Sequence, residues 1–286
     1  MSGMQHGIGN ARWRNQPECA NQECQFRSPL RKFMPWRNRE GVVLQGQWYC
    51  SLDCFERAIT GVFSGLLKLD DSRPPHLHRV PLGLLLLGRG VINQDQLKAG
   101  LMAQRETSHD RLGRCLVRLG AVLPHDVSEA LAAQWGCAVF PLDQDSRYRD
   151  CSQMIPFALL ESSYMLPVHF VPESNLLFLA FAEDIDHTSL YWIERLIGVR
   201  AEPCVVTESA MQNAMEEIRG LSRPGEIVFE RVWDASEMAR TVRGYAVELG
   251  AEELVMARPR HFLWVRLRSS GRSLDLMFRL PTHRFI

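Results

Sequence analysis

The sequence lacks an apolar stretch long enough to cross a bilayer, which takes about 18 or more consecutive apolar residues. Two apolar stretches, residues 81–87 and 176–182, have only the length of a buried helix or strand. Residues 1–10 are polar and contain no signal-peptide apolar region. These absences predict a cytoplasmic protein without a membrane span.

The sequence also lacks an excess of positive charge. Its 33 lysine and arginine residues equal its 33 aspartate and glutamate residues, so the formal net charge is zero. A protein held mainly by nucleic-acid phosphates needs a positive surplus, and nucleic acid is therefore a disfavoured partner. The segment 27–39 interleaves basic residues with Phe33 and Trp36, and a solvated loop or a protein-docking loop is favoured there. Its basic residues are Arg27, Arg31, Lys32, Arg37 and Arg39.

Motifs of the common hydrolases and ATPase motors are missing as well. A motor needs a glycine-rich loop ending in Gly-Lys-Ser or Gly-Lys-Thr, whereas residues 83–90 end in Arg89 and Gly90. There is no Gly-x-Ser-x-Gly elbow and no His-Glu-x-x-His pair, and Ser64 and Cys137 have no evident activating base. We therefore expect a protein that is not an enzyme and has no catalytic residues.

What the chain does contain is a globular composition. Its 286 residues are 46% hydrophobic and 23% charged, which suits two or three folded units. Turn-rich segments predict four parts, residues 1–69, 79–134, 135–220 and 225–286. The order of expected elements gives an α+β, multi-domain fold: a small zinc finger, a repeat of helical hairpins followed by an α+β domain, and a C-terminal helix with a three-stranded antiparallel sheet.

Four of the eight cysteines form two close pairs. Cys19 and Cys24, with Cys50 and Cys54, supply the thiolate set of a closed tetrahedral site, which predicts structural Zn²⁺. Residues 42–49 are expected to form a hairpin turning at residues 45–46, and residues 51–59 a helix, so the module resembles a treble-clef finger. The remaining cysteines are scattered in apolar surroundings and are expected to be buried free thiols: Cys115, Cys137, Cys151 and Cys204.

Residues 81–134 contain one pattern twice, shifted by thirty residues. The repeated positions are Leu82, Gly83, Leu86, Gly90, Leu101, Ala103 and Gln104, which correspond to Leu112, Gly113, Leu116, Gly120, Leu131, Ala133 and Gln134. Each copy predicts a short helix, a left-handed glycine cap and a second helix. Asn93 and Gln96 resemble a capping box, and Pro124 suits a first helical position. From spacing alone, a purely structural duplication and a binding site both stay open.

The region after the repeat predicts mixed structure. Strands are expected at 139–142 and 200–206, a hairpin at 165–182, and helices at 151–161, 186–196 and 208–219, the last capped by Thr207. Asp184 and Asp186 are interpreted as a loop and helix-start cluster. The last part predicts a helix at 236–250 and strands at 252–257, 262–268 and 273–280.

The repeated pattern, Arg-Leu-Gly-x-x-Leu-Val-x-x-Gly and then Leu-x-x-x-Leu-x-x-Gln, resembles the tandem motif of the MshEN domain. That domain is the N-terminal part of type II secretion and type IV pilus assembly ATPases, and some members bind cyclic di-GMP. The resemblance covers residues 79–219. Residues 225–286 are similar to the start of the region preceding the motor core, with Ala-Glu-Glu-Leu-Val in place of Ala-Ser-Asp-Ile-His.

The resemblance implies a cyclic di-GMP site on the motif positions. In the first copy these are Leu82, Gly83, Leu86, Gly90 and Gln104, and in the second Arg111, Leu112, Gly113, Leu116, Gly120 and Gln134. An arginine plane can stack on guanine or fork onto its acceptor edge, and glycine lets backbone N–H groups approach phosphate. Pro81 stands where the first copy of the motif has arginine, and Arg79 or Arg105 would have to substitute.

Two functions therefore fit the sequence. The first is a non-catalytic regulatory adaptor related to secretion and pilus assembly ATPases, with a protein partner and with cyclic di-GMP as its ligand. The alternative is a structural protein–protein interaction module of such a system without a nucleotide ligand.

Overall fold

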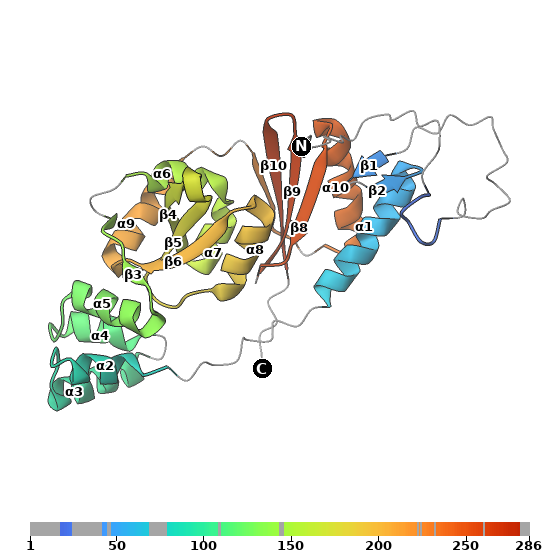
Figure 1. The fold of residues 1–286 in the computed structure, drawn as a ribbon. Helices are drawn as coiled ribbons and strands as arrows, with labels where there is room; N and C mark the ends of the chain where they lie inside the picture. Colours follow the sequence, from blue (N-terminus) through green and yellow to red (C-terminus); the bar gives the residue numbers. More distant parts are fainter. Residues whose placement is uncertain are drawn as a thin grey trace, which may run out of the picture. The chain divides into compact units, whose positions relative to one another are not determined.

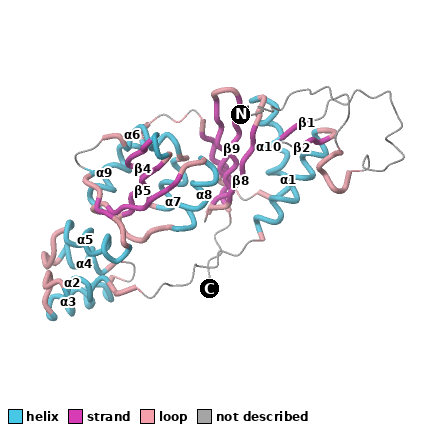
Figure 2. The backbone as a smooth tube through the Cα atoms, in the orientation of Figure 1, coloured by secondary structure: helices cyan, strands magenta, loops and turns pink. Residues whose placement is uncertain are grey.

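The computed structural model (Figure 1) describes residues 18–24, 42–44, 47–68, 79–107, 110–142, 146–221, 223, 225–231, 233–259 and 261–280. The basic segment 27–39 and the turn at 45–46 lie outside these residues. Two compact units form, one from Met1–Asp71 with Arg223–Ile286 and the other from Ser72–Ser222. Both combine helices with a sheet, so the fold class is α+β (Figure 2). None of the described helices combines the length and the apolar character needed to cross a membrane.

The duplicated sequence folds into two helical hairpins within the second unit. Their helices are α2 (Leu82–Gly88), α3 (Gln94–Glu106), α4 (Leu112–Arg118) and α5 (Pro124–Trp135). The expected capping box of Asn93 and Gln96 is confirmed, and Pro124 is the first residue of α5. Gly90 and Gly120 have φ of 71° and 66°, the left-handed region that glycine enters without strain. These local signals set where each hairpin turns.

The hairpins pack reciprocally through the glycines at the start of each motif. A Cβ atom placed on Gly83 would lie 3.0 Å from Cδ2 of Leu112, and one on Gly113 would lie 3.3 Å from Cδ2 of Leu82. Each motif's leucine thus covers the other motif's glycine. Leu86 and its counterpart Leu116 are fully buried in the shared core. Neither hairpin alone could bury its apolar stripe.

The glutamine at the end of each motif links the two hairpins through a hydrogen bond to the backbone just before the other motif. Gln104 Nε2 donates to the carbonyl oxygen of Asp110 at 3.2 Å, one residue before the second motif. Gln134 Nε2 donates to the carbonyl oxygen of Val80 at 2.7 Å, one residue before the first motif. The pairs Gln104–Asp110 and Gln134–Val80 are related by the thirty-residue shift, so the bundle has an internal two-fold correspondence.

A four-stranded sheet with helices completes this unit. Its strand order is β3-β6-β5-β4, with β4 antiparallel to β5 and β6 parallel to both β5 and β3. The strands are β3 (Ala138–Val139), β4 (Met165–Val171), β5 (Leu176–Phe181) and β6 (Arg200–Val205). The helices are α6 (Tyr148–Cys151), α7 (Phe157–Ser163), α8 (His187–Ile197) and α9 (Glu208–Arg219), with a 3-10 turn at Ser152–Met154. Helix α5 packs on β3 and β6 and joins the bundle to this α/β layer.

Two side-chain caps in this layer agree with the sequence. Asp186 accepts hydrogen bonds from the backbone N–H groups of Thr188 and Ser189 at the start of α8. Thr207 accepts one from Ala210 at the start of α9. The single helix expected at 151–161 is wrong, because Pro156 disfavours helical backbone at Ile155, which has ψ of 137°. The chain breaks there and restarts as α7.

In the other unit, helix α10 lies between a sheet and helix α1. The elements are β1 (Val42–Leu44), β2 (Gln47–Tyr49), α1 (Leu52–Leu67), β7 (Glu226–Phe229), α10 (Ala235–Leu249), β8 (Glu253–Ala257), β9 (Phe262–Ser269) and β10 (Arg272–Arg279). Phe55, Ile59 and Phe63 of α1 share one core with Met238 and Val242 of α10. Segments from the two ends of the chain therefore form one hydrophobic core.

The C-terminal sheet has one strand more than expected. Strands β8, β9 and β10 form the predicted antiparallel meander, but β7 adds a fourth strand parallel to β10, giving the order β7-β10-β9-β8. The sequence signal for β7 is weak, because a four-residue strand that pairs in parallel has no hairpin turn to mark it.

The core shared by the two hairpins predicts that alanine substitutions at two leucines, one in α4 and one at its C-cap, lower the free energy of unfolding by unequal amounts. Leu116→Ala should lower the free energy of unfolding by about 2 to 5 kcal/mol, because a fully buried side chain leaves a cavity. Leu119→Ala, at an exposed position, should change it by less than about 0.5 kcal/mol. Equal costs in denaturant unfolding would contradict the packing described.

Candidate functional site

A cleft of about 1200 Å³ opens between the helical bundle and the α/β layer of the same unit. Six of the eleven positions at which the resemblance implies a cyclic di-GMP site line it, from both copies of the repeat. They are Leu82, Gln104, Arg111, Leu112, Gly113 and Gln134. The fold therefore brings motif residues distant in the sequence to one surface.

The other five of these positions lie in the hydrophobic core or at helix ends. Gly83 is covered by leucine side chains, and Leu86 and Leu116 are completely buried. Gly90 and Gly120 terminate the first helix of each copy and do not line the cleft. The repeat thus divides into core positions, caps and a smaller group that faces the cleft.

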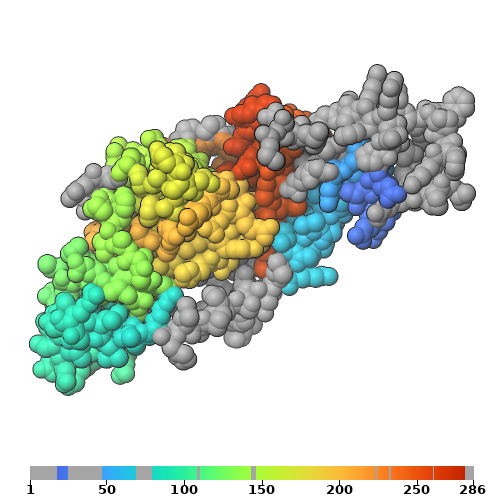
Figure 3. Space-filling model, in the orientation of Figure 1, coloured from blue at the N-terminus to red at the C-terminus, as the bar shows by residue number. Residues whose placement is uncertain are grey.

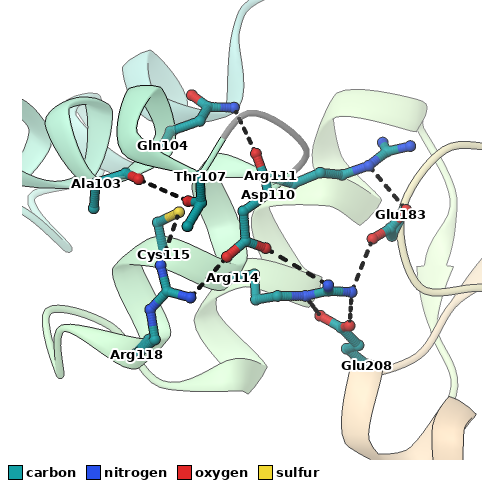
Figure 4. Close-up of polar contacts among 10 residues, drawn as sticks. All are labelled: Ala103, Gln104, Thr107, Asp110, Arg111, Arg114, Cys115, Arg118, Glu183 and Glu208. Atoms are coloured by element: carbon teal, nitrogen blue, oxygen red, sulfur yellow. Dashed lines mark hydrogen bonds and ion pairs between the residues drawn. The ribbon is translucent and has the colours of Figure 1, made fainter.

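Arg111 and Arg114 tie α4 to the α/β layer (Figure 4). Arg111 Nε lies 2.8 Å from Glu183 Oε2, and its Nη1 lies 2.5 Å from Asp184 Oδ2. Arg114 Nε donates to Glu208 Oε2 at 3.1 Å, and its Nη2 contacts Glu183 Oε1 at 3.4 Å. The Glu208 contact raises the pKa of Arg114. Glu183 therefore bridges the two arginines.

Carboxylates outnumber cations in the cleft lining. The acidic residues are Glu161, Glu183, Asp184, Glu208 and Glu216, and the basic residues are Arg111, Arg114 and Arg219. Arg219 pairs with Glu161 at 2.6 Å, so each of these three arginines already has a carboxylate partner. Among the described residues that line the cleft, no arginine is therefore left over for an anionic ligand.

The first copy has no arginine at its start. Pro81 is the exposed N-cap residue of α2. Arg79 lies nearby in sequence and stacks its guanidinium 3.2 Å from the ring centroid of Trp135. Burial lowers the pKa of Arg79, and the Asp184 carboxylate partly offsets this. Arg79 is thus held at the α5 end of the bundle, within electrostatic range of a carboxylate that also pairs with Arg111.

Tyr164 adds an aromatic ring to the cleft lining. It follows α7 with φ of 46°, a left-handed conformation uncommon for residues other than glycine. Burial raises the pKa of Tyr164, and the Glu208 and Glu183 carboxylates raise it further. The phenol stays protonated at neutral pH and can stack or donate a hydrogen bond.

The four paired cysteines converge in the other unit. Cys24 and Cys54 each lie near Cys50, both with Sγ–Sγ distances of 3.4 Å, and Cys24 lies 3.6 Å from Cys54. The Cys19 sulfur joins them within 4.8 Å and accepts from the Cys50 backbone N–H. All four are buried and unlinked by disulfides. This is a candidate metal site.

Local structure positions each of these thiols. Cys54 lies in the first turn of α1, where its N–H donates to the N-cap hydroxyl of Ser51 at 3.2 Å. The loop 19–24 is attached to β2 through the Ala20 N–H and the Trp48 carbonyl oxygen, 2.7 Å apart. Burial raises the pKa of Cys50, and so do the neighbouring thiols. The group would stay protonated unless a cation replaced the protons.

The sequence did not indicate Glu183 and Glu208 as site residues. Glu183 follows β5 and Glu208 begins α9, and both reach α4 across more than sixty residues of chain. A lone glutamate after a strand or in a first helical turn is common, so no local pattern marks these two. Only the three-dimensional arrangement pairs them with Arg111 and Arg114.

No known family model matches the chain. The chain is 24% identical over 134 residues to the type IV pilus assembly ATPase PilB of Thermus thermophilus, covering 47% of this chain and 15% of that relative. This match confirms the resemblance to pilus assembly ATPases, although the chain spans only a small part of the relative's length.

Two solved structures are also similar. "Structure of MshE with cdg" is 22% identical with a TM-score of 0.41, covering 49% of this chain and 99% of that one. The N-terminal domain of XpsE is 21% identical with a TM-score of 0.36, covering 47% of this chain and 91% of that one.

Proposed function

We propose that this chain is a non-catalytic regulatory adaptor of a secretion or pilus assembly system. The observation that carries the proposal is the cleft, because motif residues of both copies line it together. The sequence contains no phosphate-binding loop of a motor, which supports a role in binding and regulation. The partner in this proposal is a protein component of such a system.

The ligand we propose for the cleft is cyclic di-GMP. Arg111 offers a planar guanidinium that can fork onto the acceptor edge of guanine, and Tyr164 offers a ring for stacking. The lining carboxylates can accept hydrogen bonds from the guanine amino group. Each half of this ligand carries one guanine, which suits residues drawn from both copies of the repeat.

Binding would have to compete with the protein's own carboxylates. Glu183 and Asp184 hold Arg111, and a cyclic dinucleotide is a dianion that these carboxylates repel. The ligand would therefore displace both carboxylates from Arg111 and weaken the link between α4 and the α/β layer. Ligand binding would then change the contact between the helical bundle and the α/β layer of this unit, which is the kind of response that a regulatory adaptor requires.

Calorimetric titration tests the nucleotide proposal. The double variant Glu183→Gln/Asp184→Asn should bind cyclic di-GMP about fivefold to tenfold more tightly than the wild type, because two partly exposed ion pairs no longer compete. Arg111→Ala should abolish measurable binding. Arg118→Ala, a variant of the same helix outside the cleft lining, should bind as the wild type does.

A second candidate function is a protein interaction module with no nucleotide ligand. The excess of carboxylates in the cleft and the existing partners of its arginines favour this alternative. Absence of saturable heat with both the wild type and Glu183→Gln/Asp184→Asn would reject cyclic di-GMP and leave the interaction module.

We also propose that the four cysteines bind structural Zn²⁺. Thiolates about 2.3 Å from a tetrahedral zinc ion lie roughly 3.8 Å from one another. The sulfur separations of 3.4 to 3.6 Å and the common limit of 4.8 Å support this ligand set. Four protein ligands leave no position for substrate, so the ion would stabilise α1 and the core that α1 shares with α10.

Metal removal tests the zinc proposal. Purified protein should contain one zinc ion per chain, and chelation should lower the melting temperature by at least about 10 °C. Amide protection should fall in both α1 and α10, because the two helices share one core. Cys54→Ser should lose zinc, whereas Cys137→Ser, outside the cluster, should retain it. Metal-free protein with the same melting temperature would contradict the proposal.

A further inference from the structure

The chain enters the first hairpin at the end of α5. Gln134, which lines the cleft, donates from Nε2 to the carbonyl oxygen of Val80 at 2.7 Å. Helix α2, which follows, packs on α5. Figure 3 shows the first hairpin, in teal, next to the second hairpin, in green. The backbone just before the first motif is therefore attached to a residue of the cleft lining.

Arg79 lies in this attached segment, two residues before the first motif. Its guanidinium lies 3.2 Å from the ring centroid of Trp135, the last residue of α5. The centroids of the Trp135 ring and of the His187 ring, at the start of α8, are 5.9 Å apart. The loop that leads into α8 contributes residues 182–184 to the cleft lining. Arg79 therefore lies where the bundle meets this loop.

Arg79 differs from the arginines of the cleft lining in its partners. Arg111, Arg114 and Arg219 each pair with a carboxylate, whereas Arg79 forms no ion pair within the described part of the chain. Burial lowers the pKa of Arg79, and the carboxylate that partly offsets this effect is Asp184. Asp184 also lies 2.5 Å from Nη1 of Arg111. One carboxylate therefore attracts the arginines that lie at the start of both motifs.

Arg105 is the other arginine that could replace the one missing from the first motif. It lies in the last turn of α3, is exposed, and contacts no aromatic ring or carboxylate among the described residues. An arginine already held against a ring loses less side-chain freedom on binding a ligand than an exposed one does. Arg79, stacked on Trp135, is therefore the better placed of the two.

Stacking on Trp135 leaves the hydrogen-bonding edge of the Arg79 guanidinium available. The group is planar and its N–H donors point outward in that plane, so a ring against one face does not block them. A fork of two N–H donors matches the O6 and N7 acceptors on the edge of guanine. Adenine carries an amino donor in place of O6, so the same fork distinguishes the two purines.

We propose that Arg79 binds the second guanine of cyclic di-GMP, in place of the arginine that Pro81 replaces. This inference rests on the proposed function, in which Arg111 binds the first guanine. A ligand that displaces Asp184 from Arg111 also removes the carboxylate that attracts Arg79, so one displacement makes both guanidinium groups available. Arg79 lies outside the cleft lining in this structure, and its side chain would turn along the Trp135 ring toward the position that Asp184 leaves.

Calorimetric titration of the full-length chain with two probes tests this assignment. The probes are cyclic di-GMP and the mixed dinucleotide cyclic GMP–AMP, in which adenine replaces one guanine. The wild type should prefer cyclic di-GMP at least about fivefold, because an arginine binds each guanine. Arg79→Ala should bind cyclic di-GMP at least about fivefold more weakly and should bind both probes about equally, because only Arg111 then recognises a guanine. The matched control Arg105→Ala should keep the affinity and the preference of the wild type.

The outcomes separate this assignment from the proposed function. If Arg111→Ala abolishes binding but Arg79→Ala keeps the wild-type preference, the assignment of Arg79 is wrong and the proposed function stands. Equal weakening of both probes in Arg79→Ala indicates a merely structural role and also overturns the assignment, as does loss of the preference in Arg105→Ala. Absence of saturable heat in both the wild type and Glu183→Gln/Asp184→Asn rejects the proposed function and this inference with it. If Arg79→Ala fails to fold, Arg79→Lys, which keeps the charge without the planar fork, should show the same loss of preference.

Discussion

Each of the two helical hairpins depends on the other for its core. Leu112 covers Gly83, Leu82 lies against Gly113, and the buried leucines of both copies share one interior. The glutamine at the end of each motif bonds to the backbone just before the other motif begins. This mutual closure explains why the pattern occurs twice, because one hairpin alone would expose its leucines to water.

The two copies have kept this closure and diverged on their outer faces. The second copy presents Arg111 and Arg114 to Glu183, Asp184 and Glu208 of the α/β layer, whereas the first presents Pro81 and Leu84 to solvent. One copy is therefore anchored within its own unit by charge, and α2 of the other copy contains no charged side chain that could form such pairs. The proposed role of the cleft depends on the charged side of this asymmetry, because Arg111 lines the cleft.

Signals carried by neighbouring residues were readable from the sequence. The capping box at Asn93, the proline that begins α5, the helix start at Asp186, the cap at Thr207 and the pairing of the C-terminal meander were all expected and are confirmed. The four cysteines were expected to lie together, and their sulfur atoms do.

Features that depend on long-range contacts were not readable. Strand β7 pairs with a strand nearly fifty residues away, and the core shared by α1 and α10 joins segments from the two ends of the chain. The carboxylates that pair with Arg111 belong to no periodic sequence pattern that would mark them as its partners. In such cases the sequence fixes neither the partner nor the distance, because tertiary packing decides both.

Substitution of Gly100 tests the packing of one hairpin on the other most directly, because helix propensity and packing predict opposite changes in the free energy of unfolding. Alanine in an open helical position stabilises by up to about 1 kcal/mol relative to glycine, as expected for Gly61→Ala, where nothing lies within 4 Å. Gly100 lies in α3 of the first hairpin, and an added Cβ there would meet Cδ2 of Leu116 in the second hairpin at 2.6 Å, so Gly100→Ala should destabilise by about 1 to 3 kcal/mol. Denaturant unfolding in which Gly100→Ala stabilises the protein as Gly61→Ala does would contradict the mutual packing of the two hairpins.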